Sequence, residues 1–144
     1  MKSRAFTLIE ILLAIAVIAI IAGIMTPIFL SSQVRNDIDV ATLSLVRSIR
    51  RAEQLSRNGE GDSAWGVNLS SGEILIFKGP SYIGRDSSFD ESFSIPNNIS
   101  FSGTSSVVFN KFSGLPSASG TINLTSINNE TRVININSKG SVDY

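Results

Sequence analysis

The chain has 144 residues, and its 12 Lys and Arg residues balance its 12 Asp and Glu residues, so the formal net charge is zero. This length fits one small domain plus an anchor, and the charge balance gives no reason to expect an acidic partner such as nucleic acid. The chain contains no Cys, which excludes disulfides and thiolate metal sites, and no His, the usual general base and metal ligand. These absences argue against most classes of enzyme.

The first 30 residues divide into a short basic leader, residues 1–5, and a long apolar run, residues 6–30. The polar side chains within that run are Thr7, Glu10 and Thr26. A helix needs about 20 mainly apolar residues to cross a bilayer, so we expect residues 6–30 to form a transmembrane helix. The basic leader predicts a cytoplasmic N-terminus and an extracytoplasmic C-terminal part. An ordinary secretory signal is the alternative, but its apolar core is shorter, and Glu10 would weaken it.

Residues 31–58 carry a second helical pattern, because apolar residues recur at steps of three and four. These residues are Val34, Ile38, Ala41, Leu45, Ile49, Ala52 and Leu55. The opposite face carries a basic stripe, defined here as Arg47, Arg50, Arg51 and Arg57. We interpret the basic stripe as a solvated helix face, and contact with DNA or with acidic neighbours in an assembly is the alternative.

The two helical patterns are separated only by Thr26 and Pro27, so we predict one long helix from about residue 6 to residue 57. Pro27 lacks an N–H group and its ring disturbs the preceding turn, so the helix should be loosened or kinked there. Asn58 and Gly59 form a natural helix end.

Residues 59–144 are rich in Gly, Ser, Asn and β-branched residues, which is typical of strands joined by turns. Residues 65–69 and 73–77 flank Ser70, Ser71 and Gly72 and predict a hairpin. Further strands are expected at about residues 99–102, 105–109, 121–125 and 132–137, and in the last of these Val133 alternates with Ile134 and Ile136. Residues 81–98 are the least regular segment and predict a surface loop. The predicted fold class is α+β, with one mostly antiparallel sheet of about six or seven strands covered by the helix of residues 31–58.

Glu10 is the most informative single residue, because a carboxylate near the start of a membrane helix is costly and rarely accidental. If the leader were cut between Ala5 and Phe6, a positively charged amine would appear at Phe6, four residues from Glu10 on the same side of the first helical turn. The amine could be neutralised by Glu10 of its own chain or by Glu10 of a neighbouring chain. In the second case, only a correctly staggered neighbour would satisfy both charges.

The stretch Phe-Thr-Leu-Ile-Glu, which ends at Glu10 and follows a short basic leader, resembles the class III signal of type IV pilins and type II secretion pseudopilins. The resemblance implies that a prepilin peptidase cuts between Ala5 and Phe6 and methylates the new N-terminus at Phe6. It also implies that Glu10 guides filament assembly, and that Pro27 is the helix-loosening proline common in this superfamily. Ala5 departs from the usual Gly before the cut, and because Ala is small we expect normal or slower processing.

The C-terminal region resembles the GspH/FimT type of minor pseudopilin over residues 65–69, 107–109 with Gly114, 120–125 and 132–140. The resemblance implies a pilin-like fold, with a long N-terminal helix packed on an antiparallel sheet. The implied function is a minor pseudopilin, a structural subunit of the type II secretion pseudopilus, in the inner membrane with a periplasmic domain. The alternative functions are a minor type IV pilin that primes pilus assembly or DNA uptake, and a plain single-pass protein with a binding domain.

The expected partners are other pseudopilins or pilins in a helical filament, the prepilin peptidase and inner-membrane lipid, with nucleic acid only in the type IV pilin alternative. We expect no catalytic residue, no cofactor and no metal. Two acidic groups, Asp86 with Asp90 and Glu91, and Glu60 with Asp62, are candidates for calcium. Neither group has a recognisable ligand spacing, so polar surface loops are the preferred interpretation.

Overall fold

The computed structural model describes residues 6–144, except for the side chains of residues 24–31. Ala5, on the leader side of the predicted cleavage site, therefore lies outside the described residues. The chain divides into two compact units, Met1–Gln33 and Val34–Tyr144.

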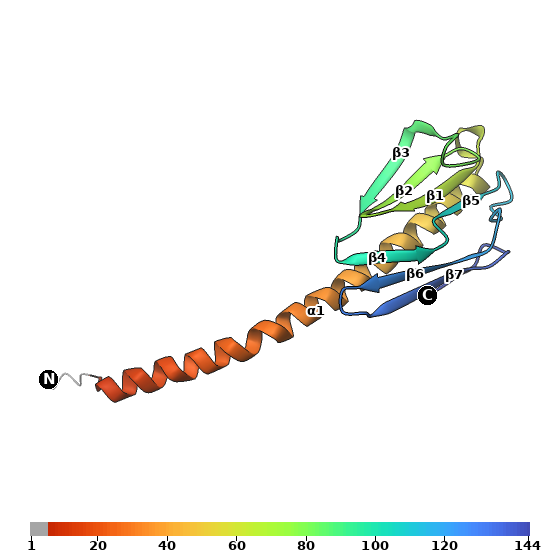
Figure 1. Cartoon of the computed structure of the whole chain (residues 1–144). Coiled ribbons are helices and arrows are strands. Elements are labelled where there is room, and N and C mark those ends of the chain that lie inside the picture. Colours follow the sequence, from red (N-terminus) through yellow and green to blue (C-terminus); the bar gives the residue numbers. More distant parts are fainter. Residues whose placement is uncertain (1–5) are drawn as a thin grey trace. The chain divides into compact units, whose positions relative to one another are not determined.

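Helix α1 comprises Leu8–Arg57, which confirms the prediction of one helix through both patterns (Figure 1). It begins after Thr7, whose carbonyl accepts a hydrogen bond from the Glu10 amide at 3.1 Å. It ends where Gly59 adopts a left-handed backbone with φ of 66°, a conformation that glycine reaches without the steric cost of a Cβ.

The helix assignment continues through Pro27, whose side chain lies outside the described residues, so a kink at Pro27 stays a prediction. The transmembrane segment expected over residues 6–30 also includes side chains that are not described. Within the part of the chain that is described, no helix is both long and apolar enough to span a membrane.

After a short 3-10 helix, η1 (Glu60–Asp62), the described residues form two four-stranded antiparallel sheets. The first has the strand order β3-β2-β1-β5, and the second has the order β4-β6-β7-β8. The bounds are β1 (Trp65–Ser70), β2 (Glu73–Lys78), β3 (Asp86–Ser94), β4 (Ile99–Gly103), β5 (Ser106–Phe109), β6 (Gly120–Ser126), β7 (Thr131–Ile136) and β8 (Val142–Asp143). The predicted hairpin is confirmed, since β1 pairs with β2 from Trp65↔Lys78 to Ser70↔Glu73.

The prediction of a single sheet is wrong. The chain leaves the first sheet after β3, returns to it at β5 and leaves it again before β6. Strand β5 pairs with β1, whereas β6 pairs with β4 and β7, so the segments around residues 105–109 and 121–125 belong to different sheets. Apolar alternation tells which side chains face a core, but it does not tell which strands exchange hydrogen bonds.

The prediction of a surface loop over residues 81–98 is also wrong, because β3 lies within it. Strand β3 is at the edge of its sheet and pairs only with β2. Its side chains are exposed or half-buried along the whole strand. An edge strand with neither face fully covered needs no regular alternation of apolar residues, which is why its sequence is mostly polar.

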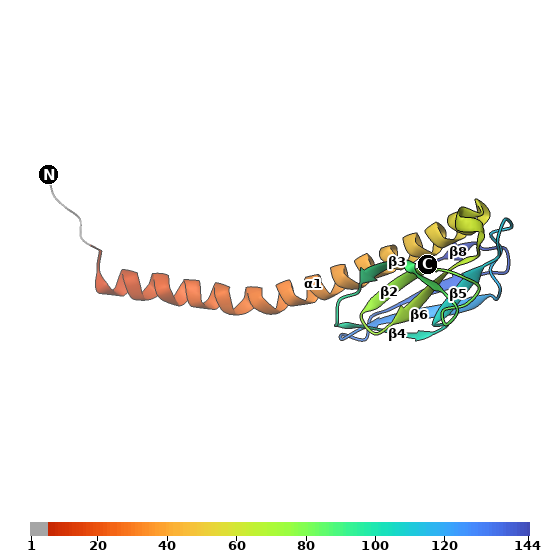
Figure 2. The same ribbon diagram turned by 90° about the horizontal axis from the view of Figure 1, so that it is seen from above.

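A single core joins the second half of α1 to both sheets (Figure 2). Six of the seven apolar helix positions predicted to face the sheet are buried, and Leu55 is half-buried. In β7, Ile134 and Ile136 are buried whereas Val133 is 46% exposed, which confirms the predicted alternation. Because two sheets rather than one contribute to this core, α1 also buries positions outside the predicted face. These are Thr42, Val46, Ser48 and Ser56.

Ser56 connects α1 to the neighbouring strands β1 and β5 of the first sheet. Its side chain is fully buried. Its hydroxyl donates a hydrogen bond to the Phe109 carbonyl at 2.9 Å and accepts one from the Trp65 amide at 2.7 Å. Trp65 and Phe109 are paired residues of β1 and β5, so one hydroxyl satisfies two buried backbone groups.

We expect Ser56→Ala to lower the free energy of unfolding of the full-length chain by about 1–3 kcal/mol, because it leaves a buried N–H and a buried carbonyl unpaired. Urea unfolding in detergent micelles, followed by the fluorescence of Trp65, measures this loss. Ser48→Ala is the matched control, because the buried Ser48 hydroxyl donates only to the Ser44 carbonyl of its own helix, at 2.9 Å. An equal loss in both variants would contradict the bridging role of Ser56.

Candidate functional site

The N-terminal part of α1 presents an apolar surface that its own fold does not cover. Every described side chain of residues 6–23 is exposed. The large apolar side chains among them range from 47% exposed at Val17 to 78% at Leu8. Burial of a large apolar side chain is favourable by about 1.5–3 kcal/mol, so this surface requires lipid or other helices around it.

Glu10 is the one charged residue in this surface and lies in the first turn of α1. Its carboxylate has no ion pair within the described residues, and its exposed surroundings are the apolar side chains of the same helix. The positive end of the helix dipole favours a carboxylate in this turn, but that effect contributes only about 0.3–1 kcal/mol. A carboxylate moved into apolar surroundings loses far more than this, so Glu10 still needs a cation there.

Thr7 is a residue of this site that the sequence analysis missed. Its hydroxyl lies 3.4 Å from the Glu10 amide nitrogen, and the spacing Thr-x-x-Glu is that of a helix capping box. That spacing in the sequence is the signal that could have identified Thr7. A local role in starting the helix is therefore an additional explanation for Glu10, beside its predicted role in assembly.

The first 26 residues match the family model described as the prokaryotic N-terminal methylation motif. The fold is similar to that of the minor pseudopilin EpsH from the type 2 secretion system of Vibrio cholerae, with a TM-score of 0.56. That match covers 73% of this chain and 93% of EpsH, at 8% sequence identity. No curated protein sequence matches this chain significantly.

The methylation motif covers residues 1–26 of the 144-residue chain, and the likeness to EpsH shows the fold alone. The predicted α+β fold class is confirmed, because a long N-terminal helix is followed by antiparallel sheets. Cleavage between Ala5 and Phe6, methylation of Phe6, assembly through Glu10 and the kink at Pro27 stay predictions.

The basic stripe on the second half of α1 divides into two paired and two unpaired residues. Arg51 donates two hydrogen bonds to the Glu91 carboxylate, at 2.8 and 2.6 Å, and Arg57 pairs with Glu53 at 2.6 Å. The hydrogen bond and the charge of Glu91 raise the pKa of Arg51 above its usual value. Among the described residues, Arg47 and Arg50 have no ion pair, and they are the two cations of the stripe available to a partner.

Four of the five acidic residues considered as calcium ligands are engaged by groups of this chain. Asp90 pairs with Arg85 at 2.9 Å, Glu91 with Arg51, and Asp62 with Lys111. The hydrogen bond from Lys111 lowers the pKa of the exposed Asp62 below its usual value. Asp86 accepts hydrogen bonds from the amide and the hydroxyl of Ser88. Among the residues that the structure describes, no three acidic side chains lie close enough together to hold a metal ion.

We expect the Arg51–Glu91 pair to couple α1 to the edge strand β3 by about 0.5–1 kcal/mol, because both side chains are partly exposed to water. A double-mutant cycle of Arg51→Met and Glu91→Gln, with free energies of unfolding measured in detergent micelles, gives this coupling. A second cycle of Arg47→Met and Glu91→Gln is the control and should give a coupling near zero. Equal coupling in the two cycles would show that Glu91 senses only the general positive field.

Proposed function

We propose that this chain is a minor pseudopilin, a structural subunit of the type II secretion pseudopilus that takes part in protein secretion. The observation that carries this proposal is the uncovered apolar helix of residues 6–23 with Glu10 as its one charged side chain. The methylation motif over residues 1–26 and the EpsH-like fold support the same conclusion. A helix with this surface is built to be enclosed by similar helices.

Assembly would begin when a prepilin peptidase removes the leader between Ala5 and Phe6. The new amine of Phe6, methylated but still charged, would enter the filament core beside Glu10 of a neighbouring subunit. In apolar surroundings an unpaired charge is costly, so a subunit at the wrong stagger would leave two charges unsatisfied. The charge pair would therefore select the register of the filament.

The proposed organisation follows the two units of the chain. The leader, residues 1–5, faces the cytoplasm, and residues 6–30 lie in the inner membrane before assembly and in the filament centre afterwards. Residues 31–58 cover the sheets, and residues 59–144 complete a periplasmic domain. Pro27 cannot donate a hydrogen bond to the Gly23 carbonyl, which would let the helix adapt to its neighbours at this point. We propose no catalytic, cofactor or metal role.

A minor type IV pilin that primes pilus assembly or takes part in DNA uptake is the second candidate. It is favoured by the unpaired, exposed Arg47 and Arg50, which offer two cations for phosphate groups. The zero net charge of the chain is less suited to nucleic acid, so secretion is the preferred function.

We expect Glu10→Ala to lower incorporation into filaments by about tenfold or more, because breaking a buried charge pair costs about 3–5 kcal/mol. The amount of the subunit in sheared filaments, relative to the amount in the membrane fraction, measures incorporation in cells that co-express the other subunits. Membrane insertion should be unchanged, since the substitution makes the helix more apolar.

Glu10→Gln is the matched control, because it retains a side chain that can hydrogen-bond in a capping box but removes the charge. We expect Glu10→Gln to be as defective as Glu10→Ala. Normal incorporation of Glu10→Gln would show that Glu10 acts as a helix cap, and normal incorporation of both variants would overturn its assembly role.

A further inference from the structure

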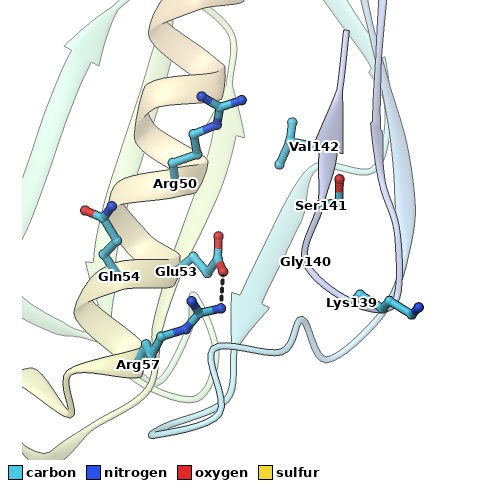
Figure 3. Close-up of a pocket in the computed structure, with 8 residues that line it drawn as sticks. All are labelled: Arg50, Glu53, Gln54, Arg57, Lys139, Gly140, Ser141 and Val142. Carbon is cyan, nitrogen blue, oxygen red and sulfur yellow. Dashed lines mark hydrogen bonds and ion pairs between the residues drawn. The ribbon is translucent and has the colours of Figure 1, made fainter.

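A hollow of about 420 Å³ lies between the last turns of α1 and the turn that joins β7 to β8 (Figure 3). One wall consists of Arg50, Glu53, Gln54 and Arg57 of α1, and the other consists of residues 139–142. Figure 3 shows the Glu53 carboxylate and the Arg57 guanidinium extending from the helix toward the turn, with Arg50 beyond them on the same side of α1. We call it the basic hollow.

The floor of the basic hollow is held in place by short contacts. Arg57 pairs with Glu53 at 2.6 Å, and the Glu53 side chain is only 17% exposed. A Cβ added to Gly114 would lie 3.0 Å from the Arg57 Nε, so Gly114 lets its backbone approach this guanidinium closely. Neighbouring protein therefore confines the Glu53 carboxylate, which Arg57 already neutralises within the hollow, whereas the Arg57 side chain is 57% exposed.

The opposite wall is a preorganised turn. The Asn137 Oδ1 accepts hydrogen bonds from the amides of Lys139 and Ser141, at 2.9 and 3.0 Å. Between these two residues, Gly140 is buried and has a φ of 86°. The turn thus fixes the backbone of Lys139, while its long side chain extends outward at the rim (Figure 3).

The basic hollow carries a surplus of positive charge on a chain whose formal net charge is zero. Three cations, Arg50, Arg57 and Lys139, line it together with one carboxylate, Glu53, which leaves a surplus of two positive charges. Arg57 is used by Glu53, whereas Arg50 and Lys139 have no ion pair within the described range. A concave site with this imbalance attracts an anion.

We propose that the basic hollow binds carboxylate side chains of a neighbouring subunit, with Arg50 as the main donor and Lys139 as a second cation at the rim. The planar guanidinium of Arg50 can donate two parallel hydrogen bonds to a carboxylate. The inference rests on the proposed function in one respect, namely that the partner is another subunit of the same filament.

The arrangement of the cations favours an acidic side chain over a nucleic acid. The neighbouring cations Arg47 and Arg51 lie in a different groove, lined by Ile76 and Phe93, and Arg51 is occupied by Glu91. The positive charges therefore do not form the continuous track that a phosphate backbone needs.

The test uses the full-length chain in micelles of a non-ionic detergent and a fluorescein-labelled hexaglutamate peptide, with hexaglutamine as the neutral probe. Fluorescence anisotropy at low salt should show binding of hexaglutamate but not of hexaglutamine. We expect Arg50→Gln and Lys139→Gln each to weaken hexaglutamate binding by about fivefold to tenfold, as loss of a charged contact does. Arg47→Gln removes an equally unpaired cation of the same helix and should change the affinity by less than about twofold.

Three results would overturn the proposal. These are the absence of hexaglutamate binding, an equal loss in Arg47→Gln, and tighter binding of a single-stranded oligonucleotide that is lost in Arg50→Gln. Because the peptide assay uses isolated subunits, it is independent of filament assembly. Failure of the basic hollow would leave the effect of Glu10→Ala on incorporation intact, and failure of the filament role would leave peptide binding intact.

Discussion

The apolar surface of residues 6–23 is not covered by any other described part of its own chain. Its large side chains are about half exposed or more, and Glu10 interrupts them with one charge. Removing this surface from water is strongly favourable, while placing a lone carboxylate in the same surroundings is strongly unfavourable. An environment that is apolar and supplies a cation at Glu10 meets both demands. A bundle of the same helices, each with a free N-terminal amine at Phe6, would meet them.

The second unit, Val34–Tyr144, has no such need, because it contains its own core. The buried apolar side chains of α1 from Val34 onward meet those of both sheets. Ser56 joins the helix to β1 and β5 through two hydrogen bonds. One continuous helix thus serves two purposes. Its first half supplies a surface for association, and its second half organises a domain that presents polar features such as the basic hollow.

Local patterns in the sequence predicted much of this fold, because they report how each segment is buried. The helical spacing from Val34 to Leu55 marked the buried face of α1, and the alternation at residues 132–137 marked the buried face of β7. The division into two sheets was missed, because it depends on pairing between distant segments. Strand β3 was missed because an edge strand with exposed faces lacks the alternation that identifies buried strands.

The residues of the candidate site could also be predicted from the sequence only in part. Glu10 stands out in the sequence because a charge within an apolar run is rare, and the methylation motif is contiguous. Arg50 and Lys139 come together only through the packing of α1 beside the β7–β8 turn, so no local pattern connects them. The sequence likewise does not show that Glu53 pairs with Arg57 rather than with Arg50.

We propose above all that Glu10 pairs with the amine that removal of the leader creates at Phe6. The most direct measurement is mass spectrometry of the intact chain, purified from cells that contain a prepilin peptidase. We expect a mature chain that begins at Phe6 and carries one N-terminal methyl group. A chain that still begins at Met1 in the presence of an active peptidase would contradict it, because no free amine would then lie within reach of Glu10.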